Sequence, residues 1–547
     1  MGLLGHACDC RGNWASLFRR PASAIGVLDG IRALAVSWVL AFHSMLFMPA
    51  LLASDAEKQH KSVPYPTAYL SFTQAWYMAP VAVGETGVDM FFLLSGFLIA
   101  YLLGKEARKT STIGCGRFLL RRWVRILPAY VVAILTYSIA TSASCLHWGW
   151  TNLLFLNNFV GPQVVQGVDT PDSSGAPCLG HSWSIAVEFQ MYVLSPMLVL
   201  AMHRLSTATS RWLPPWWTVP VVLMVLSAVL RVVLWSFTSY DDLQVVIYDK
   251  FYTRAGPYLV GMAVAQLVGP ALDAAGARKR KTTEAGKDAR LLDAAESGSA
   301  GNLVREALVS DKHSGGGSPS GGHAAGVVAE KAALNPDAAA LPRVPLVPCE
   351  RWAPVLYWVG IFLWVFLTWA RTPFLFGAYL DRPGHEWPQG VSIALYRTLF
   401  GLGVGLALFG MLIARLRGAR SERAVLRDEE DGSEAVVDPC ACCPAWAMGR
   451  WPASATSLAW FLELPALVPI ARLSYSIYLL QFIPMFLLET ITQLHMDDPE
   501  AVVWAKWLAL CAMTLVVASL MSAGVYMCAE KPCMNLRERC GASKRAA

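Results

Sequence analysis

The chain has 547 residues, of which 55% are hydrophobic and 15% are charged. Soluble domains carry about 25% charged residues, so the composition excludes a disordered chain and argues against a soluble enzyme. The net charge of +6 is too small to indicate nucleic-acid binding by itself. The 21 Trp and 17 Tyr residues suit a protein that places aromatic belts at membrane interfaces. We therefore expect a membrane protein that has no nucleic-acid partner.

Ten apolar segments predict an all-α polytopic membrane protein. A helix needs about 20 mostly apolar residues to cross the bilayer, because it rises about 1.5 Å per residue. In chain order, the predicted spans are Ile31–Ala50, Pro80–Leu103, Ile126–Ala143, Ser184–Met202, Trp216–Phe237, Tyr252–Ala271, Trp352–Ala370, Val391–Ala414, Leu473–Ile491 and Val502–Tyr526.

The basic residues predict how these spans are oriented. With the N-terminus in the cytosol, 34 Lys and Arg residues lie on the cytosolic side, six lie on the outer side and five lie within spans. Cytosolic loops of membrane proteins are enriched in Lys and Arg. We therefore expect both termini in the cytosol, which requires an even number of spans.

The same pattern divides the chain into two membrane parts and three cytosolic ones. The segment between the sixth and seventh spans is rich in Ala, Gly and Ser and has no periodic apolar residues, as is typical of disordered linkers. The predicted parts are an N-terminal tail (1–24), six helices (25–271), a disordered linker (272–350), four helices (351–528, with a cytosolic insert at 415–450) and a C-terminal tail (529–547).

Two of the 13 cysteines, Cys145 and Cys178, lie in the large outer loop between the third and fourth predicted spans. An oxidising compartment favours a disulfide between them over two free thiols. The pairing indicates an endomembrane or plasma-membrane location. No paired C-x-x-C spacing is present, so we expect no metal.

Ionisable residues within spans are expensive and are therefore candidate site residues. Arg32 and His43 are eleven residues apart, which puts them on one face of the first span, about 16 Å apart along its axis. The alternative is an arginine that reaches the membrane surface and a histidine that is bonded within the core.

Further candidates lie at the ends of the next spans. Arg122 and Arg125 share a helix face, and their forked donors suit phosphate oxygens; the alternative is a cytosolic anchor. Glu188 lies about one turn inside the fourth span and must pair, take up a proton or meet water. Asp89 precedes an apolar run and is either a helix cap or a functional group. Ser95, followed by glycine, marks a place where another helix can approach closely.

Five motifs, in this order, resemble the signature of the acyltransferase-3 family of integral membrane proteins. They are Leu28-Asp-Gly-Ile-Arg-Ala-Leu-Ala35 followed by His43, Gly87-Val-Asp-Met-Phe-Phe-Leu-Leu-Ser-Gly-Phe-Leu98, Arg122-Trp-Val-Arg125, Trp183-Ser-Ile-Ala-Val-Glu188-Phe-Gln190 and Leu473-Ser-Tyr-Ser-Ile-Tyr478-Leu-Leu. The outer loop that contains Cys145 and Cys178 is similar to that of the nose-resistant-to-fluoxetine type. The chain departs from the family at Gln481, where the family often has histidine.

The resemblance implies transfer of an acyl group, usually acetyl, from acyl-CoA to a hydroxyl of a carbohydrate, lipid or similar acceptor. On this reading, Arg122 and Arg125, with Ser95 nearby, form the donor site on the cytosolic side. His43 is the general base, because a neutral imidazole can take the proton of a hydroxyl. Glu188 orients that imidazole or holds the acceptor, and Arg32 binds phosphate or stabilises the oxyanion.

These roles require His43 and Arg122 to line one cavity. Two alternatives remain open at this point. A lipid or small-molecule transporter would use the same charged residues along a permeation path. A membrane scaffold would keep the motifs for packing only.

Overall fold

The computed structural model describes most of the chain. The described residues are 9–21, 24–58, 72–73, 75–140, 144–160, 178–207, 215–238, 244–296, 347, 349–370, 387–431, 453–488 and 498–537.

Helices make up all of the regular structure in this part of the chain. The elements up to the long sixth predicted span are α2 (Cys10–Phe18), α3 (Gly26–Lys58), η1 (Trp76–Met78), α5 (Ala79–Ala82), α6 (Thr86–Thr110), α7 (Cys115–Ala140), α8 (Ser144–Leu153), η2 (Gly180–Ser182), α9 (Trp183–Thr207), α10 (Thr218–Phe237), η3 (Gln244–Tyr248) and α11 (Phe251–Glu296). The elements that follow are η5 (Glu350–Trp352), α14 (Ala353–Ala370), α16 (Trp387–Asp431), α17 (Ala453–Leu462), α18 (Leu467–Leu480), α19 (Phe482–Leu487), α21 (Glu500–Val525) and η6 (Tyr526–Glu530).

Eight helices of the described part are long and apolar enough to cross a membrane. The predicted fold class, an all-α polytopic membrane protein, is confirmed. The two other predicted spans correspond to α7, which begins in the arginine-rich stretch, and to α18 with α19, which are separated at Gln481. The count of ten spans and the cytosolic position of both termini stay predictions.

Two helices extend beyond the ends that the sequence predicted. α11 continues to Glu296 and α16 to Asp431, so the first parts of the predicted linker and insert are helical. Alanine, lysine, arginine and glutamate in these stretches have high helix propensity, which explains the extension. Most of the remaining linker, and the insert beyond Asp431, lie outside the described residues.

The chain divides into two compact units. The first contains Met1–Leu267, Arg351–Ala414 and Ala441–Ala547, and the second contains Val268–Glu350 and Arg415–Cys440. Within the second unit, Arg417 pairs with the carboxylate of Glu350 at 3.2 Å. All residues considered below belong to the first unit.

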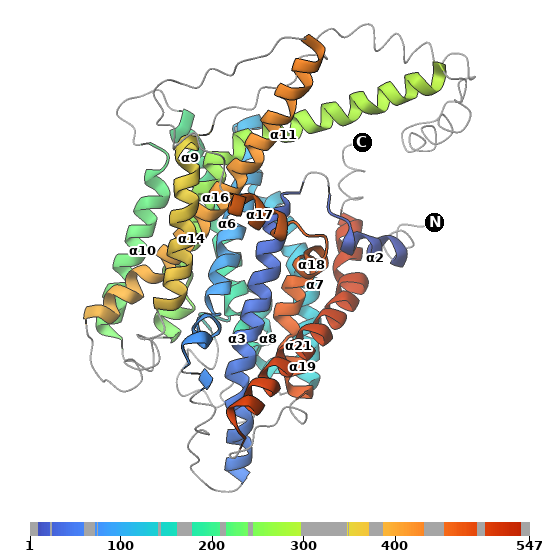
Figure 1. The fold of residues 1–547 in the computed structure, drawn as a ribbon. Helices are drawn as coiled ribbons and strands as arrows, with labels where there is room; N and C mark the ends of the chain where they lie inside the picture. Colours follow the sequence, from blue (N-terminus) through green and yellow to red (C-terminus); the bar gives the residue numbers. More distant parts are fainter. Residues whose placement is uncertain are drawn as a thin grey trace. The chain divides into compact units, whose positions relative to one another are not determined.

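α3 is the central helix of the first unit. It packs against α6 on one side and against α18 and α21 on the other, as Figure 1 shows. α6 also packs against α9, and α18 against α7. The first motif lies on α3, the second on α6, the third on α7, the fourth on α9 and the fifth on α18. Motifs that are distant in the sequence therefore meet around α3 and α6.

Two glycines allow α6 and α11 to touch backbone to backbone. A Cβ at Gly96 would collide with the carbonyl of Tyr258, and one at Gly261 would collide with the carbonyl of Leu93. Small residues permit such an approach between membrane helices. The prediction of a close helix contact beside Ser95 is thereby confirmed.

A buried network of ion pairs joins α6, α11 and α16. The carboxylate of Asp89 pairs with Arg254 at 3.2 Å and with Arg397 at 2.7 Å, and Arg397 also pairs with Glu85 at 3.1 Å. The guanidinium of Arg254 lies 4.7 Å from the ring centroid of Trp183, the first residue of α9. Asp89 is therefore an ion-pair partner rather than a helix cap, and it neutralises arginines that would otherwise be costly in the membrane.

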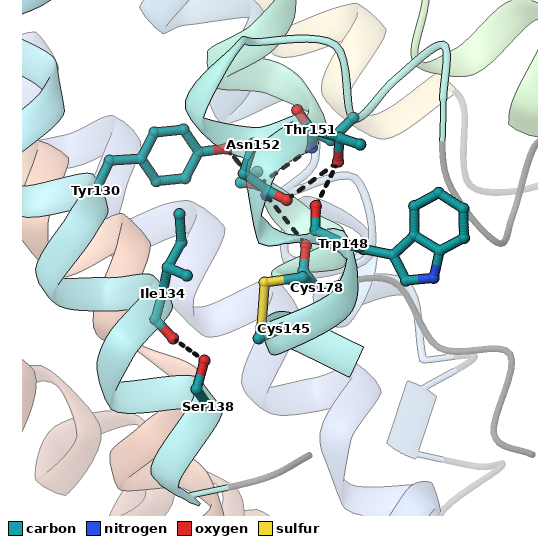
Figure 2. Close-up of a disulfide and its surroundings, with 10 residues drawn as sticks. Tyr130, Ile134, Ser138, Cys145, Trp148, Thr151, Asn152 and Cys178 are labelled. Carbon is teal, nitrogen blue, oxygen red and sulfur yellow. Dashed lines mark hydrogen bonds between the residues drawn. A yellow bond between two sulfur atoms is a disulfide. The ribbon is translucent and has the colours of Figure 1, made fainter. Parts of the chain in front are cut away.

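A second polar network lies under the outer loop (Figure 2). The disulfide Cys145–Cys178 joins α8 to the segment that enters η2, which confirms the predicted pairing. The amide nitrogen of Asn152 donates to the carbonyl of Cys178 at 3.1 Å and to the hydroxyls of Tyr130 and Ser182 at 3.1 and 2.9 Å. The disulfide and these hydrogen bonds together fix the start of η2 against α7 and α8.

Replacing Cys145 and Cys178 together by serine should lower the free energy of unfolding by roughly 3–4 kcal/mol, because the bond closes a loop of 33 residues. Thermal unfolding in detergent, followed by tryptophan fluorescence, measures the loss. Cys115→Ser, which removes an exposed free thiol, is the matched control and should leave the midpoint unchanged. An equal midpoint for the double variant and the control would contradict the stabilising role.

Replacing Asp89 by Asn should destabilise the fold by about 3–5 kcal/mol, because two buried arginines lose their shared counter-charge. Asp29→Asn breaks a partly exposed ion pair with Arg20 and should cost about 0–1 kcal/mol. The same unfolding measurement compares the two variants. Similar losses in both would show that the buried network contributes no more than a surface pair.

Candidate functional site

A cavity of about 120 Å³ lies among the helices that carry the motifs. Its wall is formed by α3, α6, α7, α9, α18 and η6. Because Arg32, Arg122 and Arg125 all line it, we name it the arginine cavity. Glu188 and Ser95 complete the set of predicted residues in this wall.

Helical spacing brings these side chains to one place. Arg122 and Arg125 are three residues apart on α7, and Ser184, Glu188 and Tyr192 follow one another at intervals of four on α9. Residues three or four apart project from the same face of a helix. Each helix therefore presents a polar stripe to the cavity, while its other faces pack or remain apolar.

Four arginines line the cavity, and one of them, Arg472, donates to the backbone carbonyl of Arg19. The other three, Arg32, Arg122 and Arg125, have no ion-pair partner among the described residues. Within the described part of the chain, none of them makes a hydrogen bond or an ion pair with another side chain. The guanidinium of Arg122 lies over the rings of Phe118 and Tyr192, 5.6 and 5.7 Å from their centroids. These stacking contacts hold the guanidinium while leaving its hydrogen-bond donors to face the cavity.

The carboxylate of Glu188 is engaged by neutral partners. The hydroxyls of Ser95 and Tyr192 both donate to its Oε1 atom. Hydroxyl donors stabilise a carboxylate in place, so Glu188 is held at the wall of the cavity and forms no ion pair with the arginines around it. Glu188 is thus one of two carboxylates in a wall that also holds four arginines.

Glu530 forms the far end of the cavity. It lies on the π-helix η6, is buried, and accepts a hydrogen bond from Ser476 of α18. Nearby, the hydroxyl of Tyr475 donates to the backbone carbonyl of Ile126 at 3.1 Å. These contacts join α18, α7 and the end of α21 around the cavity.

His43 lies on α3 but does not line the arginine cavity. Its ring centroid is 4.9 Å from that of Phe482 and 6.4 Å from that of His181. We call His43 and His181 the histidine pair. The Nδ1 atom of His43 is buried and has no hydrogen-bond partner among the described residues.

Tyr478 stands between the arginine cavity and the histidine pair. Its side chain and that of Ser184 line the cavity, and its ring centroid is 5.4 Å from that of His181. Its hydroxyl donates to the backbone carbonyl of His181 at 2.5 Å. Because a phenol has one hydrogen, the Ser184 hydroxyl, 2.7 Å away, is the donor in their contact.

The structure therefore brings five of the six predicted site residues together and separates the sixth. Arg32, Ser95, Arg122, Arg125 and Glu188 line one cavity. The wall of this cavity does not include His43, and Tyr478, which belongs to it, also lies beside His181. Within the described residues, the hydrogen bonds of Glu188 go to Ser95 and Tyr192 and not to the imidazole.

Sequence reasoning did not single out Tyr192, Tyr478 or Glu530 as site residues. Tyr192 follows Glu188 at helical spacing, and Tyr478 belongs to a motif quoted above, so both carried a signal. Glu530 begins the stretch Glu530-Lys-Pro532, which resembles the nose-resistant-to-fluoxetine type, so it too carried a signal. Among the described residues, no three His, Cys, Asp or Glu side chains gather as they would around a metal ion.

Comparison with known proteins gives a family match over most of the chain. The family model described as "Acyltransferase domain", acyltransferase-3, matches residues 25–269 and 343–523. "Nose resistant to fluoxetine protein 6" of Caenorhabditis elegans is 24% identical over 286 residues, which are 45% of this chain and 32% of that protein. "Peptidoglycan O-acetyltransferase OatA" of Listeria monocytogenes is 28% identical over 181 residues, 32% of this chain and 24% of that protein.

These matches span about a third of the nematode relative and about a quarter of the bacterial one. No solved structure matches the chain. The family match itself covers well over half of the residues and includes all five motifs. The chain therefore belongs to the acyltransferase-3 family of membrane acyltransferase domains.

Proposed function

We propose that this protein is a membrane O-acyltransferase that moves an acyl group, in particular acetyl, from acyl-CoA to a hydroxyl of a carbohydrate, lipid or similar acceptor. The observation that carries the proposal is the arginine cavity, in which Arg32, Arg122 and Arg125 have no ion-pair partner among the described residues. The family match and the bacterial O-acetyltransferase relative support the reaction class. The nematode relative's name does not specify a reaction.

The arginine cavity suits the polyanionic end of the donor. Arg122 and Arg125 can bind phosphate oxygens through their forked donors, and Arg32 adds a third positive charge. Glu188 would repel phosphate if it faced the ligand directly, but Ser95 and Tyr192 hold its Oε1 atom at the wall. In the predicted orientation the cavity faces the cytosol, where acyl-CoA is found.

His43 is the proposed general base. It is about 16 Å from Arg32 along α3, because eleven residues separate them. That distance favours Arg32 as a phosphate ligand over Arg32 as the stabiliser of an oxyanion beside His43. The pantetheine arm of the donor is long and flexible, and it can span the distance between a phosphate site and a remote base.

The chemistry is one acyl transfer with a proton transfer in each direction. The neutral imidazole takes the proton of the acceptor hydroxyl while the hydroxyl oxygen forms a bond to the thioester carbon. The carbon–sulfur bond then breaks, and the CoA thiolate takes up the proton from the imidazolium. Tyr478 lines the cavity and lies beside His181, so we propose that its side chain moves to admit the thioester.

The proposed location is an endomembrane or the plasma membrane. The disulfide supports it, because such bonds persist on the oxidising side of these membranes. The lipid bilayer, acyl-CoA and the hydroxyl acceptor are the expected partners.

Replacing His43 by Ala should abolish release of CoA from acetyl-CoA. Membranes from cells that express the protein retain the acceptor, so free thiol formed above the level of control membranes measures turnover. His147→Ala removes an exposed histidine on α8 and should keep full activity. Full turnover by the His43 variant would exclude the base, and no turnover by the unchanged protein would favour a transporter.

Replacing Arg122 and Arg125 by Gln should raise KM for acetyl-CoA by about tenfold or more each, since a lost charged hydrogen bond of about 1.4 kcal/mol is a factor of ten. kcat should change less, because the reacting atoms lie elsewhere. Arg121→Gln is the matched control, because Arg121 is exposed and does not line the cavity. An unchanged KM in both cavity variants would remove the arginines as the donor site.

A further inference from the structure

Gln481 offers a buried hydrogen-bond acceptor next to the proposed base. It separates α18, which ends at Leu480, from α19, which begins at Phe482, and it is fully buried. Its amide nitrogen donates to the carbonyl of Tyr478 at 2.9 Å. Its Oε1 atom is buried and has no hydrogen-bond partner in the described part of the chain. A buried acceptor without a hydrogen bond destabilises the fold, so a donor is expected close to this atom.

His43 supplies the complementary group. Its Nδ1 atom is also buried and without a partner among the described residues, and the side chain of Gln481 interacts with its imidazole. Phe482, the next residue in the chain, packs against the same ring. A hydrogen bond from Nδ1–H to Oε1 would satisfy both atoms at once.

The second nitrogen of His43 is in a different position. Nε2 of His43 also has no hydrogen-bond partner in the described residues, but unlike Nδ1 it is not buried. It is therefore accessible. A neutral imidazole carries one hydrogen, so a hydrogen on Nδ1 leaves the lone pair on the accessible nitrogen, where a hydroxyl can approach.

The other histidine of the pair, His181, already makes a hydrogen bond through its ring. Nε2 of His181 lies 3.2 Å from the backbone carbonyl of Leu479. A carbonyl only accepts, so this nitrogen carries the hydrogen of the neutral ring. His181 is thus tied to α18 through its Nε2 atom, whereas neither ring nitrogen of His43 has a hydrogen-bond partner among the described residues.

We propose that Gln481 is a positioning residue for His43: its side-chain carbonyl accepts the Nδ1–H hydrogen bond and fixes the tautomer whose Nε2 receives the acceptor proton. The inference rests on the proposed function, and it gives Gln481 the orienting role that the sequence suggested for Glu188. Gln481 does not touch substrate. An amide carbonyl accepts at every pH, so the tautomer is held without a second titrating group.

The ¹⁵N spectrum of the imidazole tests the hydrogen bond directly, because protonated and unprotonated ring nitrogens resonate far apart. The full chain is labelled with ¹⁵N-histidine in detergent, and the His43 signals are those that His43→Ala removes. The unchanged protein should show Nδ1 protonated. Gln481→Leu should give a mixture of tautomers, while Gln481→Glu, which keeps an oxygen acceptor, should restore the Nδ1–H form.

Turnover of acetyl-CoA in membranes is measured on the same variants. Gln481→Leu should lower kcat by about 10- to 100-fold, less than the full contribution of a general base, about 10²- to 10⁴-fold. KM for acetyl-CoA should stay the same, and Gln481→Glu should recover most of the rate. Ser44→Ala removes a buried hydroxyl beside His43 in the chain and should change neither the spectrum nor kcat.

The outcomes separate the two proposals. An Nε2–H tautomer in the unchanged protein, or an unchanged spectrum in Gln481→Leu, overturns the role of Gln481 whatever the activity. If Gln481→Leu does not fold, the proposal is tested by the His43 tautomer in the unchanged protein and in Gln481→Glu. The expected spectra without any turnover support the hydrogen bond and overturn the proposed acyl transfer.

Discussion

The matching of charge inside apolar surroundings governs this structure. Asp89 neutralises Arg254 and Arg397 deep between helices, because an unpaired guanidinium there would be very costly. Arg32, Arg122 and Arg125 of the cavity differ from these two arginines, because they have no ion-pair partner in the described residues. Carboxylates thus form ion pairs with arginines where helices are joined, whereas Glu188 and Glu530 in the cavity accept hydrogen bonds from hydroxyl groups.

The ion-pair network around Asp89 and the arginine cavity are linked through α9. The ion-pair network sets the start of α9 through the contact of Arg254 with Trp183. α9 in turn carries Glu188 and Tyr192 into the cavity wall. A change in the network can thus alter the cavity without touching any residue that lines it.

Local pattern predicted much of this arrangement. The apolar segments indicated the helices, the cysteine pair its disulfide, and the motifs five of the residues that share a cavity. The ion-pair partners of Asp89 could not be predicted from the sequence, because Arg397 lies 308 residues away in the chain. The separation of His43 from the arginines was also hidden, since helical spacing places residues on a face but does not reveal that Tyr478 packs between them.

The disulfide helps to hold in place His181, one member of the histidine pair. Cys178 is held both by Cys145 and by Asn152, and His181 follows only three residues later. Reduction frees one end of that short segment and leaves the placement of His181 to the remaining hydrogen bonds. The covalent bond between Cys145 and Cys178 thus bears on the position of His181 without touching its ring.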